Sequence, residues 1–170
     1  MKQFICKIFN QDAHISKVVF PVYTEHTASI FYIVVQATKS FKSNFSSYTI
    51  AVLVIACNRP DAVKKCLNGL LKHRPSREQF PIIVSQDCGD DATAQAISTY
   101  GNQVFHIKQP DLSNINISGN MRRFQGYYKI SRHYKWALGQ VFDEMPYENV
   151  LIVEDDLEIG TTNFVKILLV

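Results

Sequence analysis

The sequence predicts an α/β domain in which a mostly parallel sheet is flanked by helices. From residue 49 to residue 156, apolar runs of strand length alternate with segments whose apolar residues recur at helical spacing. The connections between these runs are too long for hairpins, which favours parallel strands joined by crossovers. The length of 170 residues and the hydrophobic content of 46% suit a domain with a substantial core.

The first expected strand, residues 50–57, is followed by a helix over 61–73, with Pro60 at its first position. The later expected elements are a strand over 80–87, a helix over 92–100, a strand over 103–107, a loop over 109–120, a helix over 124–143 and a strand over 150–153. The core face of the helix over 124–143 is expected to carry Tyr127, Ile130, Tyr134, Ala137, Leu138 and Val141.

Residues 1–48 are expected to form an N-terminal segment and linker ahead of a domain at 49–170. The apolar run 28–35 is too short to cross a bilayer of roughly 30 Å. It is expected to be a strand or a poorly ordered segment rather than a membrane anchor or signal peptide. Residues 39–47 are polar and serine-rich, as in a linker. The net charge of +3 comes from scattered basic residues, which argues against nucleic acid as a partner.

Three consecutive acids, Glu154, Asp155 and Asp156, follow the last expected strand. They either cap the next turn or hold a hard divalent cation together with substrate phosphates. Right-handed crossovers and the common order of such sheets place the first strand between the second and the last. Ligands bind such sheets at the switch point, here between the first and last strands. Arg59 and Asp87 should therefore lie around one cleft with the acids.

Cys57 and Cys88 end neighbouring parallel strands, whose spacing of about 4.8 Å is near the separation that a disulfide tolerates. They are expected to pair in an oxidising compartment; otherwise they are two reduced cysteines that pack together. Cys66 lies on the inner face of its helix and is expected to be an inert buried thiol. Sequons at Asn44 and Asn116 would accept glycans in a secretory compartment. No glycine-rich dinucleotide or P-loop motif follows the first strand, which excludes both of those classes.

Several stretches, in one order, resemble the N-acetylglucosaminyltransferase I family, and together they cover about two-thirds of the chain. They are residues 53–59, 80–89, 109–115, 124–130, 132–140 and 153–158. The resemblance implies a GT-A type nucleotide-sugar-binding fold, incomplete at its C-terminus, and a single-pass type II protein of the Golgi membrane. It also implies an inverting enzyme that uses Mn²⁺. Such an enzyme transfers N-acetylglucosamine from UDP-GlcNAc to the alpha-1,3 mannose arm of a high-mannose N-glycan.

Carried over by position, the resemblance makes Asp156 the metal ligand and places Glu154 and Asp155 against the nucleotide sugar. The uridine and ribose contacts would be Arg59, Asp87 and His133, and Cys57 with Cys88 would match a family disulfide. The blander alternatives are a sheet-edge cap for Arg59, a turn residue for Asp87 and a solvated surface histidine for His133.

The catalytic base is expected beyond Val170, so the chain is expected to be a fragment that binds UDP-sugar weakly and does not transfer it. Two other functions stay open. One is an inactive module that binds UDP-sugars or glycans. The other is a related O-mannose N-acetylglucosaminyltransferase, which residues 86–89 and 126–129 disfavour.

Overall fold

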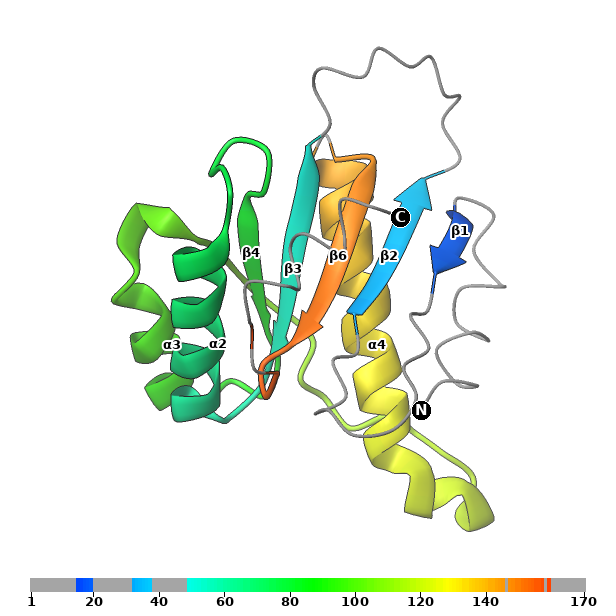
Figure 1. Cartoon of the computed structure of the whole chain (residues 1–170). Coiled ribbons are helices and arrows are strands. Elements are labelled where there is room, and N and C mark those ends of the chain that lie inside the picture. The colour runs from blue at the N-terminus through cyan, green and yellow to red at the C-terminus, as the bar shows by residue number, and fades with distance from the viewer. Residues whose placement is uncertain (1–14, 20–31, 38–48, 146, 158, 160–170) are drawn as a thin grey trace, which may run out of the picture.

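The computed structural model describes residues 15–19, 32–37, 49–145, 147–157 and 159. Their strands form one sheet with the order β1-β2-β6-β3-β4-β5 (Figure 1). The strands are β1 (Ile15–Val19), β2 (Tyr32–Ala37), β3 (Ile50–Ala56), β4 (Ile82–Gln86), β5 (Phe105–Lys108) and β6 (Asn149–Glu154). The helices are α2 (Pro60–His73), α3 (Asp91–Ser98) and α4 (Gln125–Gly139), with short 3-10 segments η1 (Gly101–Gln103) and η2 (Gly119–Phe124) and a π-helical segment η3 (Gln140–Glu144).

The four strands from β6 to β5 are parallel, and β3 lies between β4 and β6. The register pairs Ile55 with Glu154 and Ala56 with Gln86, so the carboxyl ends of β3, β4 and β6 meet at one edge of the sheet. This is the common order of doubly wound sheets. The predicted fold class, a mostly parallel sheet flanked by helices, is confirmed.

β1 and β2 extend the sheet beyond β6, and both pairings are antiparallel. The part of the apolar run 28–35 that the structure describes belongs to β2, which agrees with the strand interpretation. Residues 28–31, the expected linker at 39–47 and the sequon at Asn44 lie outside the described residues. The division of the chain at residue 48 stays a prediction. Among the described helices, none has the length and apolar character needed to cross a membrane.

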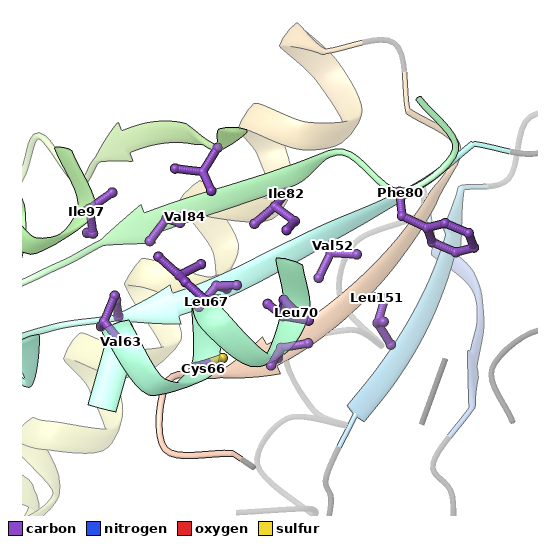
Figure 2. Packing of buried hydrophobic residues seen from close by; sticks show 14 residues of the cluster. Val52, Val63, Cys66, Leu67, Leu70, Phe80, Ile82, Val84, Ile97 and Leu151 are labelled. Atoms are coloured by element: carbon purple, nitrogen blue, oxygen red, sulfur yellow. The ribbon is translucent and has the colours of Figure 1, made fainter. Parts of the chain in front are cut away.

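One face of the sheet is covered by α2 and α3 (Figure 2). Alternate strand residues such as Val52, Val54 and Leu151 pack against Leu67 and Leu70 of α2. These side chains are 0–1% exposed, so they supply much of the hydrophobic stabilisation of this face. The bounds of α2 agree closely with the expected helix, because Pro60 and the apolar spacing are local signals.

The opposite face is covered by α4, whose Tyr134, Ala137 and Leu138 pack on Leu53 and Ile83. Two residues expected on this core face are not buried, since Tyr127 is 44% and Ile130 is 43% exposed. That part of the prediction was wrong. The first turns of α4 extend past the ends of the strands, so no sheet lies beneath them (Figure 1). The apolar residues continue at helical spacing through these first turns, but the sheet does not extend far enough to cover them.

Candidate functional site

Glu154 is the last residue of β6, and Asp155 and Asp156 lie in the turn that follows it. The main chain continues the ladder one residue past the strand, because Asp155 N donates to Ile55 O at 3.2 Å. Glu154 points to the α4 face, where Tyr134 Oη donates to its Oε1 at 3.2 Å. Asp155 is 1% exposed and Asp156 is exposed. The end of β6 therefore has one exposed carboxylate, that of Asp156, next to the hydrogen-bonded carboxylate of Glu154 and the buried carboxylate of Asp155.

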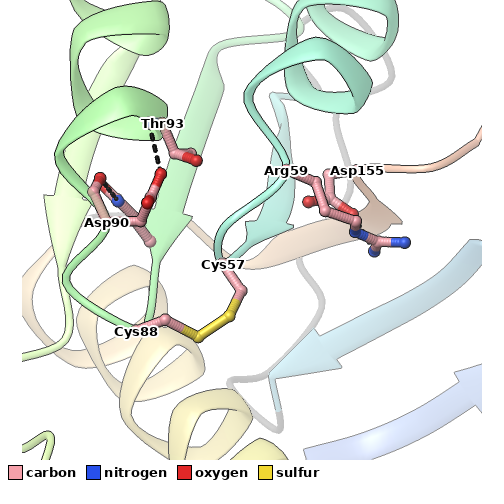
Figure 3. The surroundings of a disulfide bond; sticks show 7 residues. Cys57, Arg59, Cys88, Asp90, Thr93 and Asp155 are labelled. Atoms are coloured by element: carbon pink, nitrogen blue, oxygen red, sulfur yellow. Dashed lines mark hydrogen bonds and ion pairs between the residues drawn. A yellow bond between two sulfur atoms is a disulfide. The ribbon is translucent and has the colours of Figure 1, made fainter.

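Arg59 lies in the turn between β3 and α2 and joins the two aspartates. Its Nη1 donates to Asp156 Oδ2 at 3.0 Å, and its Nη2 donates to Asp155 Oδ1. Figure 3 shows Arg59 beside Asp155, at the end of β6 and next to the turn after β3. Arg59 therefore does more than cap a sheet edge, because it bridges both acids of the neighbouring strand.

Asp155 is the less usual of the two aspartates. Burial raises the pKa of Asp155, and the nearby guanidinium of Arg59 opposes that rise. Its Oδ2 atom is buried and has no hydrogen-bond partner within the described part of the chain. A buried carboxylate oxygen without a partner is costly, so the ion pair with Arg59 is important for keeping Asp155 ionised.

A second polar group lies at the end of β4. His133 of α4 is only 3% exposed, so the interpretation as a solvated surface histidine was wrong. Its Nε2 forms a hydrogen bond of 2.8 Å with Ser85 Oγ of β4. Burial lowers the pKa of His133, and the charge of Asp87 partly opposes this. The imidazole is therefore neutral at pH 7 and lies within electrostatic reach of Asp87.

Ser85 is the residue of this group that the sequence analysis missed. It lies in a fully buried strand whose preceding residues are all apolar. A hydroxyl in such a position needs a partner, and this is the signal that could have indicated it.

The structure joins Cys57 to Cys88 in a disulfide, with Cα atoms 5.2 Å apart (Figure 3). Cys88 and Gly89 follow one another with φ values of 70° and 65°. A non-glycine residue in this left-handed region is unfavourable, so the tight turn is held by its surroundings. Asp87 N donates to Ala56 O at 2.9 Å, which brings the two turns together. The disulfide thus links the turn that carries Arg59 to the turn that follows Asp87.

Two polar groups therefore flank β3, Arg59 with the acids of β6 on one side and Ser85, Asp87 and His133 on the other. No hydrogen bond or ion pair joins the two groups within the part of the chain that the structure describes. In that part, no cluster of three or more His, Cys, Asp or Glu side chains could hold a metal ion. A cation here would rely on one or two carboxylates and on oxygens of a ligand. Magnesium and chemically similar ions are commonly bound in this way.

The chain belongs to the GNT-I family, whose sequence model matches residues 23–167. Among curated proteins, it is similar to alpha-1,3-mannosyl-glycoprotein 2-beta-N-acetylglucosaminyltransferase of Arabidopsis thaliana. The two are 35% identical over 115 residues, which is 67% of this chain and 26% of the relative. The chain therefore spans about a quarter of the length of that relative.

The fold is also similar to solved structures of S. aureus TarS. TarS 1–349 aligns with a TM-score of 0.49 at 20% identity, covering 71% of this chain and 32% of that protein. TarS 1–349 in complex with UDP-GlcNAc aligns with a TM-score of 0.48 at 20% identity, covering 71% of this chain and 30% of that protein.

Proposed function

We propose that this chain forms the donor-binding part of an N-acetylglucosaminyltransferase of the GT-A type. The enzyme transfers N-acetylglucosamine from UDP-GlcNAc to the alpha-1,3 mannose arm of a high-mannose N-glycan, with inversion at the anomeric carbon. The observation that carries the proposal is the family match over residues 23–167, which includes Arg59 and the three acids at the end of β6, Glu154, Asp155 and Asp156. The position of these residues at the switch point between β3 and β6 supports it, since ligands bind such sheets there.

In this proposal the two polar groups bind different parts of the donor. Asp87 and His133 contact the uridine, with Arg59 close to the ribose and phosphates. Glu154 and Asp155 lie against the nucleotide sugar.

We assign Asp156 as the protein ligand of a Mn²⁺ ion. Its carboxylate is a hard oxygen donor on an exposed strand end, which fits a cation that is held mainly by the donor's phosphates. Such an ion acts as a Lewis acid on the departing diphosphate. Arg59 bonds Oδ2 of Asp156, so Oδ1 would be the oxygen that holds the cation, and the guanidinium beside it would attract the anionic diphosphate. An inverting transfer also needs a base for the acceptor hydroxyl, and we assign that role to no acid of this chain.

We also propose a location in the Golgi lumen, with the protein held in the membrane as a type II protein. The disulfide between Cys57 and Cys88 supports an oxidising compartment. Asn116 is exposed, so its sequon is accessible to glycosylation there. Expression in a secretory pathway followed by glycosidase treatment tests this accessibility: a mass shift that Asn116→Gln reduces is expected, and no change would contradict it.

Calorimetry with UDP-GlcNAc, with and without Mn²⁺, tests the donor site. We expect UDP-GlcNAc to bind only when Mn²⁺ is present, and we expect UDP without the sugar to show the same dependence on Mn²⁺. Asp156→Ala should weaken this binding by at least tenfold, whereas Asp143→Ala, which removes an exposed acid of η3, should leave it unchanged. Binding of UDP that ignores Mn²⁺ and Asp156 would refute the assignment.

A transfer assay separates an enzyme from a binding module. The chain is incubated with UDP-GlcNAc, Mn²⁺ and a high-mannose N-glycan, and the glycan is analysed by mass. Mn²⁺-dependent donor binding without transfer indicates that this chain supplies the donor site alone. Transfer to the glycan would show that the chain also holds the base and the acceptor site.

A further inference from the structure

β4 presents two polar side chains to α4 at its carboxyl end. Ile83 packs on Tyr134 and Ala137 of α4. Side chains alternate along a strand, so Ser85 and Asp87 follow Ile83 on the same face. His133 is one helical turn before Ala137, which places it directly over this end of the strand. The sheet and the helix therefore bring a hydroxyl, an imidazole and a carboxylate together beside the proposed uridine site.

The imidazole of His133 has a well-defined orientation. Its Nε2 lies 2.8 Å from Ser85 Oγ, and both residues are almost fully buried at 0% and 3% exposure. The ring of Trp136 stacks near it, with centroids 6.4 Å apart and an angle of 22° between the planes. A ring held by a hydrogen bond on one side and a stacked indole on another has little freedom to turn.

The neighbours of the ring also decide which nitrogen carries the proton. A neutral imidazole has one N–H donor and one acceptor nitrogen. Asp87 is the charged group that acts on this ring, and its carboxylate can only accept, so it is best matched by an N–H on Nδ1, the nitrogen that Ser85 does not bond. The nitrogen bonded to Ser85 is then the acceptor, and the hydroxyl of Ser85 donates. The second hydrogen bond of a histidine commonly selects the tautomer in this way.

We propose that Ser85 is a positioning residue for the donor site: its hydroxyl donates to His133 Nε2 and holds the Nδ1–H tautomer beside Asp87. This inference rests on the proposed function for its role in UDP binding, but the hydrogen bond itself does not. An N–H next to a carboxylate offers one donor and one acceptor. That pair complements the adjacent carbonyl and N–H of a uracil edge, whereas the other tautomer would offer two acceptors.

Nitrogen NMR of the imidazole groups in the ligand-free protein tests the tautomer. The chain has five histidines, so His133→Gln identifies the signals of His133 by their loss. We expect a protonated Nδ1 and an unprotonated Nε2 that accepts a hydrogen bond. Ser85→Ala should shift the ring to a mixture of tautomers. A wild-type His133 protonated at Nε2 would overturn the proposal, whatever the behaviour of Ser85→Ala.

Calorimetry with UDP tests the consequence for binding. Ser85→Ala should weaken UDP affinity by about tenfold, the effect of one lost hydrogen bond. Ser85→Cys keeps nearly the same volume but donates weakly, so it should behave like Ser85→Ala if the hydroxyl matters rather than the packing. Thr93→Val, which removes another fully buried hydroxyl from α3, should bind UDP as the wild type does.

The outcomes separate the two proposals. A wild-type chain that fails to bind UDP refutes the proposed function, while the tautomer of His133 still decides whether Ser85 donates to it. Normal UDP affinity in both Ser85 variants, with normal binding in the wild type, would overturn the positioning role.

Discussion

The ion pair between Arg59 and Asp155 should stabilise the fold strongly at neutral pH and weakly in acid. Arg59→Met keeps most of the side-chain volume but leaves the carboxylate of Asp155 buried without its cation. Breaking a buried ion pair costs about 3–5 kcal/mol. The side chain of Arg59 is 52% exposed, so solvent weakens the pair. We therefore expect a loss of about 2 kcal/mol at pH 7.5.

The sign of the pH dependence follows from the pKa of Asp155, which burial raises above its ordinary value. The folded chain holds this proton more tightly than the unfolded chain does. Protonation of Asp155 therefore stabilises the fold. This contribution has its full value below a pH of about 4, and it is lost as the pH rises through the raised pKa of Asp155. Removing Arg59 raises that pKa further. The cost of Arg59→Met should therefore shrink to below about 1 kcal/mol near pH 4, where a neutral carboxyl needs no cation.

Urea unfolding of the wild type and Arg59→Met at pH 7.5 and pH 4 measures this difference. Arg77→Met, which removes an exposed arginine that donates to Asn102 O, should change stability by less than about 0.5 kcal/mol at either pH. Adding Asp155→Asn to Arg59→Met should restore at least half of the loss at pH 7.5, because the buried charge is gone. An equal cost of Arg59→Met at both pH values, or no rescue by Asp155→Asn, would refute the reasoning.

Three further predictions concern the cysteines and the core. Iodoacetamide at pH 8.5 should leave Cys66 unmodified in the native chain and modify it in urea, as mass spectrometry would show, because burial raises its pKa to about 12. The double variant Cys57→Ala, Cys88→Ala should lower the free energy of unfolding, measured by urea titration, by about 3–4 kcal/mol, because the disulfide closes a loop between residues 31 positions apart. A loss below about 1 kcal/mol would contradict this. Leu67→Ala should cost about 3 kcal/mol in the same assay, since the side chain is fully buried, whereas Ile130→Ala should stay within about 0.5 kcal/mol.

Local signals account for most of what could be predicted. The bounds of α2 agree because Pro60 and the apolar spacing lie within the helix itself. The order of the parallel strands, with β3 between β4 and β6, is the common one for sheets of alternating strands and helices. From that order, the meeting of Arg59 with Asp155 and Asp156 could be anticipated before any side chain was placed.

Other features depended on surfaces that the sequence pattern does not describe. The apolar run before residue 36 was compatible with a strand or an irregular segment, and its antiparallel pairing with β6 decides for a strand. Tyr127 and Ile130 repeat the spacing of the buried face of α4, but they extend past the sheet and are exposed. Periodicity indicates which side of a helix is apolar, not where its partner surface ends.

Residue types along the chain were thus enough to establish the alternation of strands and helices, the central position of β3 and the acidic edge of the sheet. Only the packed structure showed that the ring of His133 stacks with Trp136 and is bonded to Ser85, and that one oxygen of Asp155 has no partner among the described residues. The physical reason is distance along the chain. Ser85 and His133 are 48 positions apart, and contact between them exists only after α4 has packed against β4 at one particular depth.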